Sequence, residues 1–306
     1  MNIALLNDRE VGKDIGKKGT VSDFTIYNYS GEKAVAFYEP TNYPEKLQPL
    51  LHVLQSCDYC LLFAEKVDAL LGEQIVALDL VGASGAVVCT DFVYEQLKPL
   101  LGQTSLKDWP VLARDAKVLV SHVLAIAEPK RNPGRKKLII DHSFSVKSVG
   151  DVVLGNSLQG INKHEKLFLY PVGKEVFVRS IQVHDKEVES TKEGDRTGLC
   201  LKGAELEEMG RGAVLGTEGI SVSGELACTV RLTNVWKKSL QEVRQFQLSI
   251  GLQFLPAELK SVDAKGAGTY STVFLLGKPA SFEKGDLVIL TRPEEKLRVV
   301  GAGRVA

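Results

Sequence analysis

Residues 144–203 read FSVKSVGDVVLGNSLQGINKHEKLFLYPVGKEVFVRSIQVHDKEVESTKEGDRTGLCLKG, and this stretch decides the fold of the C-terminal half. Strand-length runs of aliphatic and β-branched residues alternate in it with turns rich in Gly, Asn and Asp, and no long helical period occurs. The same pattern continues in runs such as 226–232, 245–254 and 286–291. Evenly spaced short strands with such turns predict antiparallel β-barrels, and the length is sufficient for two of them, with a seam at 217–224.

The segment before this region has a different pattern. Its apolar, strand-like runs lie at 2–6, 33–39, 59–65 and 85–91, and its helical segments lie at 43–55, 69–83, 92–102 and 116–127. Continuous apolar strands between helices predict an α/β domain with a mostly parallel sheet covered on both faces. Residues 128–137 (EPKRNPGRKK) then contain two prolines, one glycine and five basic residues, which is typical of a linker. The predicted domains are an α/β domain at 1–133 and β-barrels at 134–222 and 223–306.

The charges of the 306-residue chain balance, with 38 basic and 38 acidic residues. This neutrality removes the simplest argument for nucleic-acid binding and gives no reason to expect DNA as a partner, although a local basic face remains open. No apolar run approaches the length of a membrane span, and the N-terminus MNIALLNDRE becomes charged too early for a signal peptide. We therefore expect a cytoplasmic protein that does not bind a membrane.

Five cysteines are spread through the chain, mostly inside apolar runs, and are expected to be buried free thiols. Cys57 and Cys60 form a Cys-x-x-Cys pair, but a zinc site needs four ligands and the sequence has no second pair. The five histidines also lack the spacing of metal ligands. The sequence predicts neither a metal nor another cofactor.

The stretch NDREVGKD, which begins at Asn7, partly matches a P-loop. Asn7 stands at the first glycine position, which is tolerable because Asn enters the left-handed region readily. Gly12 and Lys13 are present, but Asp14 replaces the Ser or Thr and would put a carboxylate beside a triphosphate. The pattern becomes strand-like by about Thr20, which leaves no room for the helix whose N-terminus should face the phosphates. We interpret the motif as a remnant or a coincidence.

The residues quoted at 144–203, followed by MGRGAVL at 209–215, resemble domain 2 of translational GTPases of the elongation factor Tu kind. The shared features are a strand with Phe-Ser, a Gly-rich turn into VVLG, a Gly-Asp before a Gly-Leu strand, and an Arg-Gly before the exit. VRSIQVHDKEV and GLQFLPAEL are similar to the SelB branch, particularly to archaeal SelB-like factors, one group of which has been proposed to serve pyrrolysine. LTRPEEKLRVVGAGRV at 290–305 resembles domain 3. The resemblance rests on motifs over 135–306 and on the order of elements over 1–134.

The resemblance implies that the motifs that bind phosphate and magnesium are lost. Val21 falls where the family has the magnesium-binding Thr. In YEPTN, Tyr38 replaces the Asp of the Asp-x-Pro-Gly-His motif and Pro40 is retained. Thr41 replaces the Gly that senses the γ-phosphate, and Asn42 replaces the His that positions water.

The guanine-reading motif is altered as well. It appears as TDFV, in which Thr90 is retained, Asp91 replaces the Lys and Val93 replaces the Asp. The late Ser-Ala motif is replaced by other residues near 112–115. Phosphoryl transfer depends almost wholly on positioning and charge, so we expect neither GTP hydrolysis nor tight GTP binding, and no catalytic residue. The residues of the degenerate nucleotide site are Asn7, Gly12, Lys13, Asp14, Pro40, Thr90 and Asp91.

The resemblance also implies contacts with aminoacyl-tRNA. Arg196 falls where SelB-type factors carry an arginine that recognises the aminoacyl group, and His184 falls on another wall of that pocket. Arg135 and Lys136 fall on the strand that enters it. Arg suits fork-like contact with oxygens, so a polar or anionic ligand is expected. RNA contact candidates in the last domain are Lys237, Lys238, Arg244, Tyr270 and Arg292.

Each of these residues also has an ordinary structural interpretation. Arg196 then pairs with nearby Glu193 or Asp195, and His184 is a turn residue. The basic linker either neutralises RNA phosphates or is a solvated segment. Its cluster consists of Lys130, Arg131, Arg135, Lys136 and Lys137.

The leading hypothesis is a SelB-like elongation-factor homologue that has lost its nucleotide machinery and binds tRNA, with aminoacyl-tRNA or the ribosome as partner. One alternative is an active GTP-dependent elongation factor with an atypical pocket. Another is a protein-interaction scaffold without RNA binding. Nucleotide titration and tRNA binding separate the three.

Overall fold

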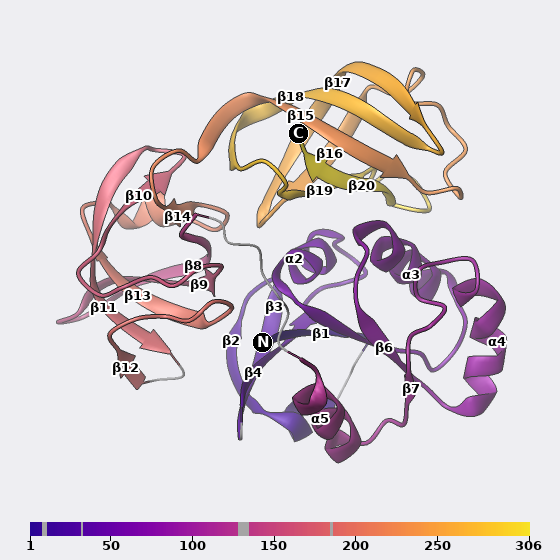
Figure 1. The fold of residues 1–306 in the computed structure, drawn as a ribbon, viewed down its shortest axis with the longest axis horizontal. Helices are drawn as coiled ribbons and strands as arrows, with labels where there is room; N and C mark the ends of the chain where they lie inside the picture. Colours follow the sequence, from indigo (N-terminus) through magenta and orange to yellow (C-terminus); the bar gives the residue numbers. More distant parts are fainter. Residues whose placement is uncertain (8–10, 32, 128–134, 184–185) are drawn as a thin grey trace.

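The computed structural model describes residues 1–7, 11–31, 33–127, 135–183 and 186–306. The described chain forms an α/β domain followed by two β-barrels (Figure 1). The predicted fold class is therefore confirmed. Among the described residues, no helix has the length and apolar character needed to span a membrane.

The α/β domain is built on a seven-stranded sheet in the order β2-β3-β4-β1-β5-β6-β7. β1 pairs in parallel with β4 and β5, and β6 and β7 continue the parallel part, whereas β2, β3 and β4 pair antiparallel. The strands are β1 (Asn2–Leu6), β2 (Lys17–Val21), β3 (Phe24–Ser30), β4 (Ala34–Pro40), β5 (Tyr59–Phe63), β6 (Gly85–Val88) and β7 (Val111–Leu112).

Alternating side chains of the strands feed two hydrophobic cores, one on each face of the sheet. In β1, Ala4 and Leu6 belong to the core under α2, α3 and α4, while Ile3 and Leu5 belong to the core under α1 and α5. Full burial of each leucine or isoleucine side chain among them stabilises the fold by about 1.5–3 kcal/mol. The helices are α1 (Val11–Ile15), α2 (Gln48–Ser56), α3 (Ala69–Val81), α4 (Asp91–Leu101) and α5 (Ala116–Ala125).

The middle barrel has the strand order β10-β14-β8-β9-β13-β11-β12, and a further pairing of β10 with β11 closes it. A 3-10 helix, η1 (Leu206–Met209), packs against β8 beside the exit strand β14. The strands are β8 (Lys137–Val146), β9 (Gly150–Ser157), β10 (Lys166–Tyr170), β11 (Lys174–Val183), β12 (Lys186–Val188), β13 (Arg196–Lys202) and β14 (Val214–Gly216).

The C-terminal barrel is closed in the order β15-β18-β17-β16-β19-β20. Its first strand begins at Ser221, close to the predicted domain start at 223. The strands are β15 (Ser221–Leu232), β16 (Gln245–Ile250), β17 (Gln253–Gly266), β18 (Thr269–Phe282), β19 (Leu287–Thr291) and β20 (Val299–Val305).

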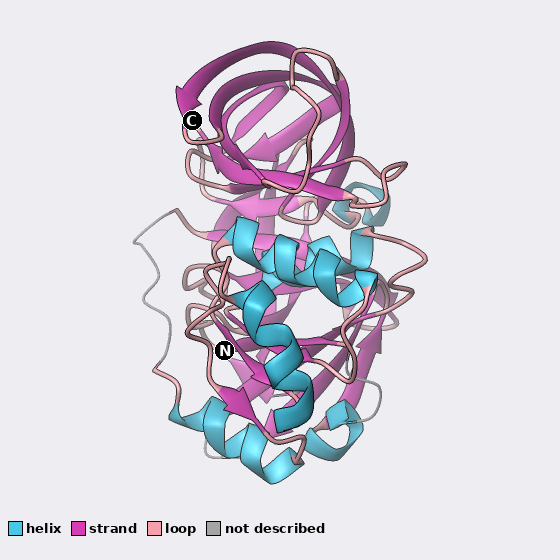
Figure 2. Ribbon diagram, turned by 90° about the vertical axis from the view of Figure 1, so that its right-hand side faces the viewer, coloured by secondary structure: helices cyan, strands magenta, loops and turns pink. Residues whose placement is uncertain are grey.

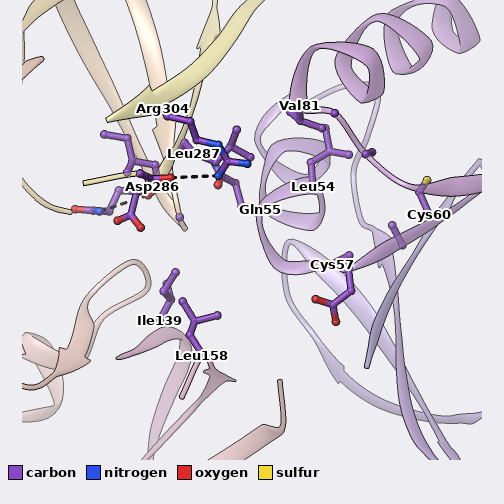
Figure 3. A pocket seen from close by; sticks show the side chains of 18 of the residues that line it. Leu54, Gln55, Cys57, Cys60, Val81, Ile139, Leu158, Asp286, Leu287 and Arg304 are labelled. Carbon is purple, nitrogen blue, oxygen red and sulfur yellow. Dashed lines mark hydrogen bonds between the residues drawn. The ribbon is translucent and has the colours of Figure 1, made fainter. Parts of the chain in front are cut away.

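The C-terminal barrel packs on α2 and α3 of the α/β domain, and Figure 2 shows helices between that barrel and the sheet. Val299 and Ala302 of β20 belong to the same hydrophobic core as the buried residues of these helices. Gln55 Nε2 at the end of α2 donates hydrogen bonds to the carbonyl oxygens of Ser249 (3.1 Å) and Leu287 (3.3 Å). A cavity of about 340 Å³ remains where the three domains meet (Figure 3).

Candidate functional site

Two adjoining crevices follow the carboxyl edge of the parallel strands, where α/β sheets usually bind ligands. The first crevice has a volume of about 270 Å³ and includes Asn7 after β1 and Pro40 at the end of β4. The second has a volume of about 640 Å³ and includes Thr90 and Asp91 after β6. Because Phe63 and Glu65 line both, the structure brings these four predicted residues to one continuous edge.

Asn7 has the left-handed backbone conformation that a P-loop glycine position requires, with φ = 62°. Its side chain is engaged inside the protein. The Asn7 amide donates to Gln74 Oε1 at 2.5 Å and to the Phe63 carbonyl at 3.3 Å, and Gln74 Nε2 donates back to Asn7 Oδ1 at 2.8 Å. Gln74 is fully buried on α3. Asn7 therefore joins the end of β1 to α3.

The other P-loop residues lie on α1, which has five residues. Gly12 is buried against Tyr27, and a Cβ on Gly12 would lie 2.5 Å from a carbon of the Tyr27 ring. Packing therefore accounts for this glycine without a phosphate. Lys13 and Asp14 are exposed, and neither they nor Gly12 line the two crevices. β2 begins at Lys17, so a first helix of about a dozen residues has no room, as the sequence indicates.

The charges in the first crevice oppose an anionic ligand. Among the described residues that line it, the carboxylates are those of Glu39, Glu65 and Asp68, and the cation is Lys66, whose Nζ lies 3.3 Å from Asp68. Asp68 caps α3 by accepting a hydrogen bond from Leu71 N at 3.0 Å, and this bond is the main cause of its lowered pKa. The N-terminus of α3 thus already carries its own anion. A triphosphate would meet like charge here.

The second crevice is mostly apolar. Thr90 Oγ1 accepts a hydrogen bond from Val93 N at 3.5 Å and so caps α4, of which Asp91 is the first residue. Val93, at the position of the expected base-reading carboxylate, belongs to the hydrophobic core. Arg114 Nη1 lies 2.6 Å from Glu65 at the rim. These residues have structural roles that require no guanine.

Arg196 lies at the start of β13 and is almost buried. Its guanidinium forms a two-pronged ion pair with Asp141 of β8, in which Nη2 donates to Oδ1 at 3.0 Å and Nη1 donates to Oδ2. The structural interpretation of the sequence predicted an ion pair for Arg196, but with Glu193 or Asp195, so the partner was wrong. The charge of Arg196 is compensated inside the folded protein.

Arg196 also lines a cleft of about 300 Å³ between the α/β sheet and the middle barrel. Lys17 and Lys18 of the edge strand β2 form the opposite wall together with Asn28 of β3, and Gln182 lies on the barrel side. Both lysines are exposed. We call this hollow the basic cleft. Neither lysine was among the predicted site residues, although the two follow the P-loop-like stretch closely in the sequence.

The remaining predicted pocket residues have other partners or lie outside the described chain. Arg135 Nε lies 3.4 Å from Glu283, and Lys136 Nζ lies 2.5 Å from Glu165. Neither residue lines the basic cleft. His184, Lys130 and Arg131 lie outside the described residues. Lys137, at the start of β8, is buried and binds Asp286 at 2.6 Å.

The structure brings two of the RNA contact candidates of the C-terminal barrel together at Glu295. Lys238 and Arg292 both pair with Glu295, at 2.5 Å and 3.4 Å. Lys237 is exposed beside them, and Arg244 is exposed directly before β16. Tyr270 packs against the barrel core.

The cysteines form no disulfide among the described residues, in which all five are free thiols. Cys60, Cys200 and Cys228 are buried, as expected, whereas Cys57 and Cys89 are half-buried. In the described part of the chain, no group of three or more His, Cys, Asp or Glu side chains is arranged to hold a metal ion.

No family model matches the chain. The chain is 35% identical over 299 residues to an uncharacterized protein of Methanocaldococcus jannaschii, and the match covers 96% of each protein. It is 29% identical over 190 residues to the selenocysteine-specific elongation factor of the same organism, but this match covers 55% of the chain and 40% of that factor.

Solved structures show the same fold at low identity. The apo form of the translation elongation factor SelB from Methanococcus maripaludis matches with a TM-score of 0.82 and 20% identity, over 100% of this chain and 79% of that one. The same factor with the GTP analogue GPPNHP matches with a TM-score of 0.84 and 19% identity, over 99% and 78%.

Proposed function

We propose that this chain, which belongs with the uncharacterized Methanocaldococcus protein to a SelB-like group of the elongation factor Tu superfamily, binds RNA of the translation apparatus without binding GTP. The most direct support is that protein side chains already engage Asn7 at the edge of the sheet where phosphates would bind. Asn7 is hydrogen-bonded to Gln74, and among the described residues that line the first crevice the carboxylates outnumber the lysine. The protein is then a nucleotide-independent adaptor and not an enzyme.

The basic cleft is the best candidate for RNA contact. Lys17 and Lys18 are exposed and give the cleft its positive charge. Arg196 adds little to this charge, because Asp141 neutralises it. Lysine acts as a point charge on phosphate, so these side chains suit the backbone of a single-stranded RNA end. With Arg196 neutralised, the cleft favours RNA backbone and does not select an anionic aminoacyl side chain.

Filter binding of aminoacylated and bare tRNA tests this proposal. Measured at two salt concentrations, affinity should fall as salt rises, because lysine contacts release counterions from phosphate. GTP with magnesium should leave the affinity unchanged. If neither tRNA form binds above the level of an unrelated RNA, the adaptor function is wrong and the protein-interaction scaffold is favoured.

A further inference from the structure

Two consecutive side chains of α3 connect this helix to two different parts of the molecule. Gln74 makes the reciprocal hydrogen bonds with Asn7 at the end of β1. Glu73 binds Tyr43, in the segment after β4, and Arg298, which directly precedes β20 of the C-terminal barrel. One turn of one helix thus holds the phosphate edge of the sheet and the barrel.

The Glu73 carboxylate is saturated with donors. Arg298 donates to it from the backbone N (3.0 Å), from Nε (3.0 Å) and from Nη2 (2.5 Å), and Tyr43 Oη donates at 3.0 Å. Arg298 Nη1 donates to the Pro44 carbonyl at 2.7 Å, and the guanidinium lies 5.6 Å from the centre of the Tyr43 ring. Hydrogen bonding to Glu73 raises the pKa of Arg298, so the arginine stays charged. Glu73 itself is 5% exposed.

This contact lies at the edge of an apolar interface. Val299, the residue after Arg298, is fully buried, and with Ala302 and Ile289 it shares a core with α2 and α3. Breaking the Glu73 contacts would leave a buried carboxylate without partners and would loosen the barrel from the helix. The polar and apolar contacts therefore support the same arrangement of the two domains.

We propose that Glu73 and Gln74 form a clamp that fixes α3 and holds the C-terminal barrel on the α/β domain in one arrangement, whatever the nucleotide. In a GTPase switch, contacts of the γ-phosphate and magnesium order the segments that then move on hydrolysis. In this chain, Glu73 and Gln74 bind the end of β1, the segment after β4 and the C-terminal barrel directly, without a nucleotide. The inference rests on the proposed loss of nucleotide control, but it does not require RNA binding.

Amide hydrogen exchange of the full chain tests the clamp. In Glu73→Gln, which keeps the side-chain volume but removes the charge, peptides from α3 and from 299–305 should exchange at least about tenfold faster than in the wild type. Arg298→Lys keeps the positive charge but loses the two-pronged contact of the guanidinium. It should therefore show a smaller increase in exchange rate in the same peptides.

Arg231→Gln is the matched control, because Arg231 joins the same barrel to the same helix. Its Nη2 donates to the Asp79 carbonyl at 2.7 Å and to Oδ2 at 3.1 Å, but its side chain is 45% exposed. An exposed pair contributes little, so exchange should stay within about twofold of the wild type. If Glu73→Gln does not fold, the comparison of Arg298→Lys with Arg231→Gln decides.

Equal exchange in the clamp variants and in Arg231→Gln would overturn the clamp. A change of α3 exchange in the wild type on adding GTP and magnesium would also overturn it. If calorimetry detects GTP binding while α3 exchange stays unchanged, the proposed function fails and the clamp stands.

Discussion

The first crevice and the basic cleft lie on one sheet and have opposite electrostatic character. Among its described residues, the first crevice is lined by the carboxylates of Glu39, Glu65 and Asp68 and by Lys66, and Asn7 in its wall is hydrogen-bonded to Gln74. The basic cleft has two exposed lysines opposite an arginine that Asp141 neutralises. The exposed positive charge, and with it the proposed RNA contact, therefore lies beside the middle barrel and away from the edge where such sheets usually bind ligands.

The largest effect is expected from Asp141→Asn, which breaks the buried pair with Arg196. Removing one partner leaves an uncompensated buried charge and should destabilise the protein by about 3–5 kcal/mol, measured by thermal unfolding. The freed guanidinium should also raise the affinity of the basic cleft for RNA. The double variant Asp141→Leu/Arg196→Met should recover most of the stability, and an unchanged melting temperature in Asp141→Asn would contradict the described pair.

Lys17→Ala/Lys18→Ala should weaken tRNA binding by about tenfold in low salt and reduce the slope of log affinity against log salt by about 1–2. The fold should be unaffected, since both side chains are exposed. Lys98→Ala/Lys107→Ala removes the same charge from the surface around α4 and serves as the control. Equal losses of affinity in both double variants would mean that the basic cleft is not the RNA site.

Acid should weaken the contact between the α/β domain and the middle barrel at Asp23. His52 Nδ1 lies 3.0 Å from the Asp23 carboxylate, and the guanidinium of Arg211, in the segment before β14, also binds it. Contact with His52, followed by the charge of Arg211, lowers the pKa of Asp23 from 3.8 to about 2. A lowered pKa in the folded state contributes stability above pH 3.8, and this contribution is lost as pH falls through about 2.

The melting temperature should therefore fall more steeply between pH 4 and pH 2 in the wild type than in Asp23→Asn, with about pH 4 marking the ordinary Asp pKa. Thermal scans at several pH values measure the difference. Parallel curves for the two proteins would show that Asp23 does not contribute to acid sensitivity.

The smallest effect is expected from Asp14→Thr, which restores the P-loop consensus at that position. Asp14 is exposed on the five-residue α1 and lines neither crevice, so the change should leave both stability and GTP affinity as they are. Nucleotide titration of the variant checks this. A gain of GTP binding would show that one residue, and not the shape of the edge, prevents binding.

The architecture could be predicted from the sequence because its signals are local. Turn residues at regular spacing indicate barrels, and continuous apolar runs between helices indicate a covered parallel sheet. The shortage of chain between Gly12 and Thr20 also predicted that no full first helix forms, and α1 has five residues.

The site depended on contacts that sequence spacing does not reveal. Asp195 is adjacent to Arg196, but it lies in the turn before β13 and its carboxylate accepts a hydrogen bond from Lys192 N at 2.7 Å, so the nearest carboxylate along the chain was the wrong partner. Asp141 lies near Arg196 because β9 pairs with both β8 and β13, and Asn156 of β9 is opposite Ile139 on one side and Arg196 on the other. The pairing of Gln74 with Asn7 spans 67 positions and likewise has no local signal.

Calorimetric titration of the full chain with GTP and magnesium is the sharpest test of the proposed loss of nucleotide binding. No binding heat is expected up to millimolar nucleotide, because Asn7 is hydrogen-bonded to Gln74 and the carboxylates that line the first crevice repel a triphosphate. Saturable binding with a micromolar dissociation constant would contradict this expectation.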